Sequence, residues 1–339
     1  AWVLKGVKAG NDKAQEHYNE WFKERDYDIY RSEDFYRPYL EGKKEIESPY
    51  ESWFKIDDEG KYNSWWGFEH MPEIGTPGSS ELKFENFADY IIRDDNSIVR
   101  KWIDFGCSGY RMDASQNISQ DFWDQVRSYI KGEKRGNLQW PNGEPVMIAE
   151  NWGDATEDFV HGTFDSTMNY WFRNVIVRFV LDEESNVKYK NGGTEAEENF
   201  IPIDAYQLNE DLMQMQEKYP KESTYALLNI LSSHDVPRIL CTFGELETGR
   251  PLYPGVVKYI QKALNISKRL DIEKIHYISD FVEQGWVTQE RMDAFINERR
   301  TLAQKRYKLA TIMMMGYPGA PLVYYGDEIG MTGEMDPDN

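Results

Sequence analysis

Three acidic residues follow short apolar runs in this sequence, close to the point where each run ends. Asp113, Glu150 and Asp235 occupy these positions. Arg111 stands two residues before Asp113, and because successive side chains alternate faces along a strand, the two point the same way. A guanidinium beside a carboxylate keeps the acid ionised and fixes its orientation, as a carboxylate nucleophile requires. Taken alone, such a pair is more often a structural ion pair at the end of a strand.

The apolar runs that carry these acids alternate with segments of helical periodicity. We expect strands in the ranges 107–113, 145–150, 226–231 and 320–328, and a short strand followed by an apolar helix within 164–180. We expect helices over 85–104, with an interruption near Asp94, over 119–131, and through most of 255–315. In the helix over 119–131, the apolar residues expected to face inward are Phe122, Trp123, Val126 and Ile130. This alternation predicts an α/β fold with a parallel sheet that helices cover on both faces.

The carboxyl ends of parallel strands meet at one edge of a sheet, so the three acids are expected to lie together there. Carboxylates gathered in one place repel one another and are costly to desolvate. Their presence indicates acid–base chemistry, above all cleavage of a glycosidic bond, which uses one carboxylate nucleophile and one protonated acid. Glu150 has Trp152 close by and no cationic residue near it in the sequence, so we expect it to keep its proton near neutral pH.

The amino-acid composition indicates which classes of binding partner are expected and which are not. A formal net charge of −20 argues against nucleic acid or an anionic membrane surface. No apolar run is long enough to span a membrane, so no membrane insertion is expected. The 11 Trp, 22 Tyr and 16 Phe would suit a sugar-binding surface, although protein cores use the same residues. The many charges within 283–308 are expected to form a solvated helix face.

Four stretches resemble a known family. GYRMDA at 109–114, IAENW at 148–152 and LSSHD at 231–235 resemble the motifs of the fourth, fifth and seventh barrel strands of the α-amylase superfamily, glycoside hydrolase family 13. PLVYYGDEIGM at 321–331 resembles the region of the eighth strand. Within that superfamily the sequence is most similar to neopullulanases, cyclomaltodextrinases and amylopullulanases. The stretches that carry this narrower likeness are 48–54, 67–72 and 164–170.

The resemblance implies a role for each acid. Asp113 would be the nucleophile, Glu150 the general acid and base, and Asp235 the third acid, which holds sugar hydroxyls and favours ring distortion. The reaction would be retaining hydrolysis of α-glucosidic bonds in starch, pullulan or maltodextrins, through a covalent glycosyl-enzyme intermediate; α-1,4 bonds are expected to be cleaved, and cleavage of α-1,6 bonds is left open. Two alternatives stay open: a glucan transglycosylase, and a catalytically silent module that binds glucan or scaffolds a partner.

Four further residues are carried over as substrate-binding candidates. Arg111 would steady Asp113, and His234 would donate to hydroxyls of the sugar at the cleavage point. Trp152 is either a sugar platform on the leaving-group side, which we favour, or wall packing. Asn117 occupies the position that, in this family, contacts the leaving-group side of the substrate.

The resemblance also predicts the fold and its completeness. The family fold is a (β/α)8 barrel of the TIM type, and this sequence matches its fourth to eighth strands and lacks a match to the first three. Residues 1–80 are expected to form the loop-rich excursion that follows the third strand, and 81–339 the C-terminal part of the barrel. We expect a larger polypeptide to supply the first three strands.

The expected chemistry also bears on cofactors and on cellular location. No cofactor is required for the expected chemistry and no metal ligand is assigned; calcium is left open without a located site. An extracellular or cell-surface location is expected for an acidic polysaccharide degrader, with a cytoplasmic location as the alternative.

Overall fold

The computed structural model describes the chain in several stretches. They are residues 10, 12–17, 74, 87–132, 139–140, 143–160, 162–181, 188–190, 197–199, 201–244, 254–267, 270, 275 and 277–333. The division expected between residues 80 and 81 lies outside these stretches, as do 48–54 and 67–72. The chain separates into two compact units, Ala1–Tyr110 with Gln116–Pro145 and Arg111–Ser115 with Val146–Asn339.

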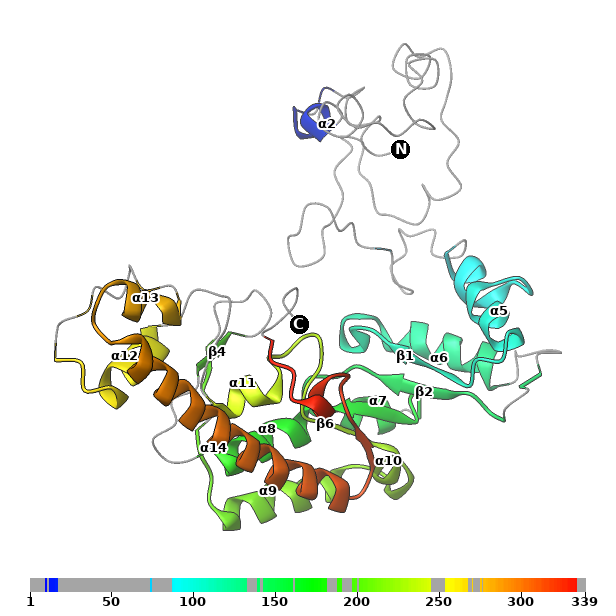
Figure 1. Ribbon diagram of the computed structural model, residues 1–339. Coiled ribbons are helices and arrows are strands. Elements are labelled where there is room, and N and C mark those ends of the chain that lie inside the picture. Colours follow the sequence, from blue (N-terminus) through cyan, green and yellow to red (C-terminus); the bar gives the residue numbers. More distant parts are fainter. Residues whose placement is uncertain are drawn as a thin grey trace. The chain divides into compact units, whose positions relative to one another are not determined.

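A five-stranded sheet organises the second unit (Figure 1). Its strands, in spatial order, are β1 (Gly109–Met112), β2 (Val146–Ala149), β3 (Ser166–Asn169), β6 (Leu228–Ile230) and β7 (Ala320–Leu322). The pairs β2–β3, β3–β6 and β6–β7 are parallel, with Ile148 opposite Ser166 in the first of them. Each strand lies within a range predicted from the sequence, and the spatial order follows the chain order. The predicted parallel α/β sheet is therefore confirmed.

The central strand β3 is unusual because its polar side chains are all buried. Thr167 Oγ1 donates to Ala149 O at 3.1 Å, and Asn169 Nδ2 donates to Asn229 Oδ1 at 2.9 Å. A buried polar group is tolerated when it is hydrogen-bonded, and these bonds run to the strands on either side. Asn169 also caps the next helix, because its Oδ1 accepts from Phe172 N at 3.0 Å.

Helices connect the strands of the second unit. They are α7 (Thr156–Val160), α8 (Tyr170–Val180), α9 (Ala205–Lys218), α10 (Lys221–Ala226), α11 (Ile239–Gly244), α12 (Pro254–Ala263), α13 (Ile278–Glu283), α14 (Gln289–Gly316) and the 3-10 turn η8 (Asp327–Ile329). The strands β4 (Lys188–Lys190) and β5 (Glu197–Asn199) pair with each other as a separate antiparallel ribbon. Helix α8 buries an apolar face against the sheet, including Phe172, Val175 and Ile176.

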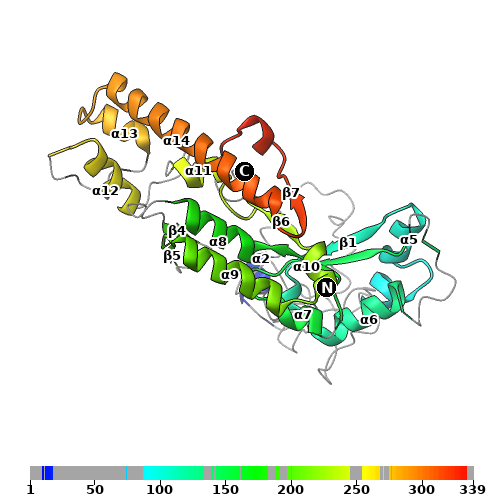
Figure 2. The same cartoon turned by 90° about the horizontal axis from the view of Figure 1, so that it is seen from below.

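Helices α12 and α13 gather at the N-terminal end of the long helix α14, as both cartoon views show (Figure 2). These segments share a hydrophobic cluster of their own, whose buried members include Val257, Ile260, Phe281, Met292 and Phe295. The rest of α14 runs along α11. The prediction that the charges of 283–308 form a solvated face is wrong at two positions, because Arg299 and Arg306 are buried.

The first unit holds shorter helical segments. They are α2 (Asp12–His17), the π-helical turn η4 (Asp89–Arg93), α5 (Ile98–Asp104) and α6 (Gln120–Ile130). The helix expected over 85–104 is interrupted as predicted, because Asp94 has an extended backbone with ψ of 148°. Helix α6 buries the four predicted residues, Phe122, Trp123, Val126 and Ile130.

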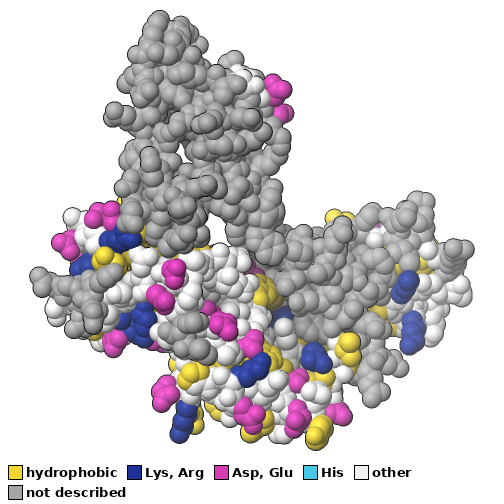
Figure 3. All heavy atoms as spheres, turned by 180° about the vertical axis from the view of Figure 1, so that it is seen from behind, with side chains coloured by type: hydrophobic (Ala, Val, Ile, Leu, Met, Phe, Trp, Pro, Cys, Tyr) yellow, Lys and Arg dark blue, Asp and Glu magenta, His cyan; other side chains and the backbone are white. Residues whose placement is uncertain are grey.

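The surface of the described residues carries mixed charge. Figure 3 shows acidic and basic side chains interspersed with hydrophobic ones on one face. None of the described helices has the length and apolar character that a bilayer crossing requires.

Candidate active site

The first two predicted acids lie side by side at one edge of the sheet. Asp113 directly follows β1 and Glu150 directly follows β2. The backbone joins the two strand ends, since Glu150 N donates to Met112 O at 3.0 Å. Ser115 Oγ closes the turn after β1 by donating to Glu150 O at 2.8 Å. Adjacent strands therefore place the two carboxyl groups at the same edge.

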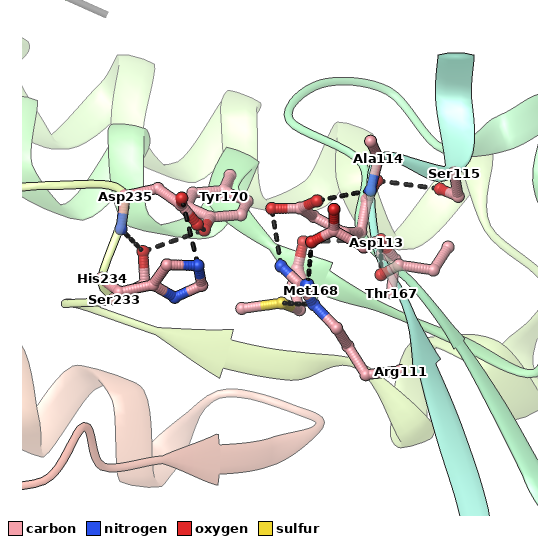
Figure 4. A network of polar contacts seen from close by, with 12 residues as sticks. Arg111, Asp113, Ala114, Ser115, Thr167, Met168, Tyr170, Ser233, His234 and Asp235 are labelled. Carbon is pink, nitrogen blue, oxygen red and sulfur yellow. Dashed lines mark hydrogen bonds and ion pairs between the residues drawn. The ribbon is translucent and has the colours of Figure 1, made fainter. Parts of the chain in front are cut away.

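Arg111 contacts both of these carboxyl groups. Its guanidinium donates to Asp113 Oδ1 (Figure 4) and lies 2.7 Å from Glu150 Oε1. The first contact agrees with the alternation of side chains along a strand. The second gives Glu150 a cationic neighbour in the fold: Arg111 is distant in the sequence but lies on the next strand of the sheet.

The two carboxyl groups differ sharply in their environment. The Asp113 side chain is 77% exposed, whereas that of Glu150 is 6% exposed. Burial raises the pKa of Glu150, the hydrogen bond from Ala114 N and the charge of Arg111 lower it, and the charges of Asp113 and Asp235 raise it, with a net upward shift. Glu150 is thus protonated up to a higher pH than an ordinary glutamate.

The backbone at Ala114 is shaped to reach Glu150. Ala114 N donates to Glu150 Oε2 at 2.6 Å, and Ala114 has a φ of 46°. This left-handed conformation is disfavoured for a residue with a Cβ and is found where surrounding contacts enforce it, often at functional sites.

The third acid lies in the turn after β6. His234 Nε2 lies 3.2 Å from Asp235 Oδ1, and Asp235 N donates to Ser233 Oγ at 3.1 Å. The charge of Asp235, like that of Asp113, raises the pKa of Glu150, so both acids interact electrostatically with Glu150. Arg111, Asp113, His234 and Asp235 accordingly appear together in the close view (Figure 4).

Tyr170 is a residue of this site that the sequence analysis did not select. Its hydroxyl lies 2.9 Å from Ser233 Oγ and donates to Asp235 Oδ2 at 3.3 Å (Figure 4). The side chain is buried, and burial is the main cause that raises its pKa. Its position directly after a strand, as for Asp113 and Glu150, was the signal that would have identified it.

Trp152 packs flat against Tyr170. The ring centroids are 4.2 Å apart and the ring planes differ by 7°. One face of the half-buried indole is therefore covered by a tyrosine that also holds Asp235. The contact fixes the position of Trp152, as either wall packing or a rigid sugar platform would require.

Comparison with known proteins decides the family. The family described as "Alpha amylase, catalytic domain" matches residues 9–252 and 277–339 of this chain. The chain belongs to the alpha-amylase family. Residues 253–276 lie outside the matched ranges.

Several alpha-amylase family relatives are similar over most of this chain. The amylopullulanase of Thermoanaerobacter thermohydrosulfuricus is 35% identical over 301 residues, which cover 86% of this chain and 16% of that protein. Neopullulanase 2 of Thermoactinomyces vulgaris is 24% identical over 294 residues, which cover 83% of this chain and 36% of that protein. The chain thus spans a small part of the length of these relatives.

Solved structures agree on the fold. A cyclic α-maltosyl-(1→6)-maltose hydrolase from Arthrobacter globiformis gives a TM-score of 0.51 at 22% identity, covering 85% of this chain and 46% of that one. The Nostoc punctiforme debranching enzyme gives 0.52 at 22% identity, covering 86% and 46%. Together with the parallel sheet, these neighbours confirm that this alpha-amylase family chain has part of a (β/α)8 barrel.

Two expectations for this alpha-amylase family chain stay predictions. Asn117 is exposed at the end of the 3-10 turn η5 (Ser115–Asn117), and its contact with the substrate stays a prediction. In the described ranges no group of three or more His, Cys, Asp or Glu residues could hold a metal ion, and no residue there is assigned to calcium.

Proposed function

We propose that this chain is the catalytic part of a retaining glycoside hydrolase that cleaves α-glucosidic bonds through a covalent glycosyl-enzyme intermediate. The observation that carries this proposal is the pairing of an exposed Asp113 with a buried Glu150 on adjacent strands, with Arg111 between them. The exposed carboxylate is accessible to a substrate and is oriented by the guanidinium, and burial raises the pKa of the other carboxyl group. Retaining hydrolysis needs one carboxyl group of each kind.

In this mechanism Asp113 attacks the anomeric carbon while Glu150 gives its proton to the leaving glycosidic oxygen. The leaving group departs, and the sugar remains as an ester on Asp113. Glu150, now ionised, takes a proton from a water molecule that attacks the same carbon and releases Asp113. Two displacements on one carbon retain its configuration, and they require carboxyl groups about 5–5.5 Å apart.

The remaining candidates would act on the sugar rather than on the bond that breaks. Asp235 accepts hydrogen bonds from sugar hydroxyls and favours ring distortion, and His234 beside it donates to hydroxyls of the same sugar. Trp152, held flat against Tyr170, offers an aromatic surface to the leaving-group side. Asn117 would contact the same side of the substrate.

The substrate class follows from the relatives and is part of the proposal. Relatives named amylopullulanase and neopullulanase, and a fold neighbour named cyclic α-maltosyl-(1→6)-maltose hydrolase, support an α-glucan such as starch, pullulan or maltodextrin. Both α-1,4 and α-1,6 bonds are candidates.

We also propose that a larger polypeptide supplies the first three barrel strands, because the chain spans 14–20% of the length of three amylopullulanases. An extracellular or cell-surface location fits a polymeric substrate.

Hydrolysis by the polypeptide that contains this chain tests the proposal. Release of reducing ends from pullulan and from maltoheptaose is measured for the wild type, for Asp113→Asn and for Asp121→Asn, an exposed acid on α6 that serves as the matched control. Asp113→Asn is expected to lose activity by about 10⁴-fold or more, while the control keeps it. Early products are expected to be α-anomers by NMR.

Other outcomes identify the alternatives. A wild type that binds glucan and releases no reducing ends would be a silent binding module. Products longer than the added oligosaccharide, formed in place of hydrolysis products, would identify a transglycosylase that uses the same intermediate.

A further inference from the structure

Helix α11 links the turn that carries His234 and Asp235 to the helical layer. It begins four residues after Asp235, and its first amide is held by that turn, since Ile239 N donates to Ser232 Oγ at 3.0 Å. The helix is only six residues long, and its last residues, Phe243 and Gly244, are buried. The last carbonyl groups of any helix lack partners within it, so burial of this end demands donors from elsewhere.

Two buried arginines of α14 supply those donors. Arg299 Nε donates to Gly244 O at 2.9 Å, and Arg306 NH1 donates to Phe243 O at 2.7 Å. The two residues are 9% and 6% exposed and stand about two helical turns apart, so they share one face of α14. A cation at the C-terminal end of a helix interacts favourably with its dipole. Both guanidinium groups therefore clamp the end of α11.

A segment that follows α11 in the sequence lies outside the residues matched by the alpha-amylase family. Residues 253–276 are unmatched and include α12. Its Tyr259 lies under the Arg299 guanidinium, with 5.2 Å from Cζ to the ring centroid. The same helix contributes Val257 and Ile260 to the cluster that it shares with α13 and the start of α14. Helix α12 thus packs on the half of α14 that precedes and includes Arg299.

We infer that Arg299 and Arg306 are positioning residues for the proposed hydrolysis, acting through α11 on the turn that carries His234 and Asp235. Helix α12 packs against α14, α14 clamps the C-terminal end of α11, and α11 holds the turn through Ser232. This inference rests on the proposed function only for its effect on catalysis; the mechanical link from α14 to the turn stands on the contacts alone.

The test compares Arg306→Met with Lys305→Met, an exposed neighbour on the same helix, in the polypeptide that contains this chain. Methionine keeps the aliphatic length and removes the donors. Amide exchange of residues 232–244 is measured by mass spectrometry, together with kcat and KM on maltoheptaose. In Arg306→Met, exchange in this segment is expected to rise about 10- to 100-fold, with kcat lowered and KM nearly unchanged. Arg306→Lys, which keeps a cation and a donor, is expected to restore part of both quantities.

Several results separate this inference from its alternatives. Unchanged exchange and unchanged kcat in Arg306→Met would overturn it, and so would equal effects in Lys305→Met. If Arg306→Met does not fold, Arg299→Lys and Arg306→Lys are compared by the same readouts, and wild-type values in both would overturn the inference. A wild type without hydrolysis would refute the proposed function, while the exchange difference would still test the clamp.

Discussion

The Tyr170 hydroxyl lies 3.3 Å from Asp235 Oδ2 and 2.9 Å from Ser233 Oγ, while its ring stacks on Trp152 with 4.2 Å between centroids. One buried side chain thereby holds the third acid with its polar end and the candidate sugar platform with its apolar face. Tyrosine is suited to this double contact because a rigid ring carries a single polar group at its tip. The consequences of the two contacts can be separated by substitution.

Tyr170→Phe removes the hydroxyl and keeps the ring that stacks on Trp152. Asp235 and Ser233 each lose a contact in a largely buried place, which corresponds to about 1 kcal/mol and a several-fold to tenfold fall in kcat/KM. Steady-state kinetics on maltoheptaose measure the change, and Tyr206→Phe on the exposed face of α9 is the control. Equal kinetics for Tyr170→Phe and wild type would show that the hydroxyl does not hold Asp235 during turnover.

Trp152→Ala distinguishes a sugar platform from wall packing. A platform loses its stacking with the substrate, and KM is expected to rise about three- to tenfold. Wall packing predicts instead a lower melting temperature with KM unchanged. Trp152→Phe, which keeps an aromatic face, should restore most of the affinity if the platform interpretation is correct, and Trp102→Ala at an exposed position of α5 controls for loss of a tryptophan.

Arg111→Met changes the pH dependence of the reaction. Glu150 must be protonated to act as the acid, so activity falls as pH rises through its pKa. The charge of Arg111 lowers that pKa, and its removal is expected to raise the pKa and move the basic limb of the kcat/KM profile to higher pH. Loss of the contact to Asp113 lowers kcat as well, by about 100-fold.

The control for this variant is Arg300→Met, an exposed arginine on α14. A basic limb that stays in place in Arg111→Met would mean that a group other than Glu150 supplies the proton.

Glu150→Gln alters how stability depends on pH. The folded-state pKa of Glu150 lies above its ordinary value of 4.5, so its contribution to stability is present in full below that value and is lost as pH rises through the folded-state pKa. Glutamine does not ionise, and the variant is therefore expected to gain stability relative to wild type between pH 4 and 8. Urea unfolding at both pH values measures the difference, and a constant difference would contradict the raised pKa.

The sequence by itself determined much of the architecture. The apolar runs predicted all five strands of the sheet, and the four inward positions of α6 followed from helical spacing. The Arg111–Asp113 pair was also readable, because alternation along one strand is a local property. Such features depend on residues within a few positions of one another, and for that reason the pattern of the chain reveals them.

Tertiary structure decided the contacts between residues that are distant in the sequence. Arg111 forms its second ion pair, with Glu150, because β1 and β2 are neighbours in the sheet. Tyr170 reaches Asp235 because α8 begins beside the turn after β6. Arg299 and Arg306 looked like part of a solvated face, since helical periodicity shows which residues share a face but not what that face meets. In the fold this face of α14 contacts the buried carbonyl groups at the end of α11. Hydrogen bonds to these carbonyl groups stabilise the two buried guanidinium groups.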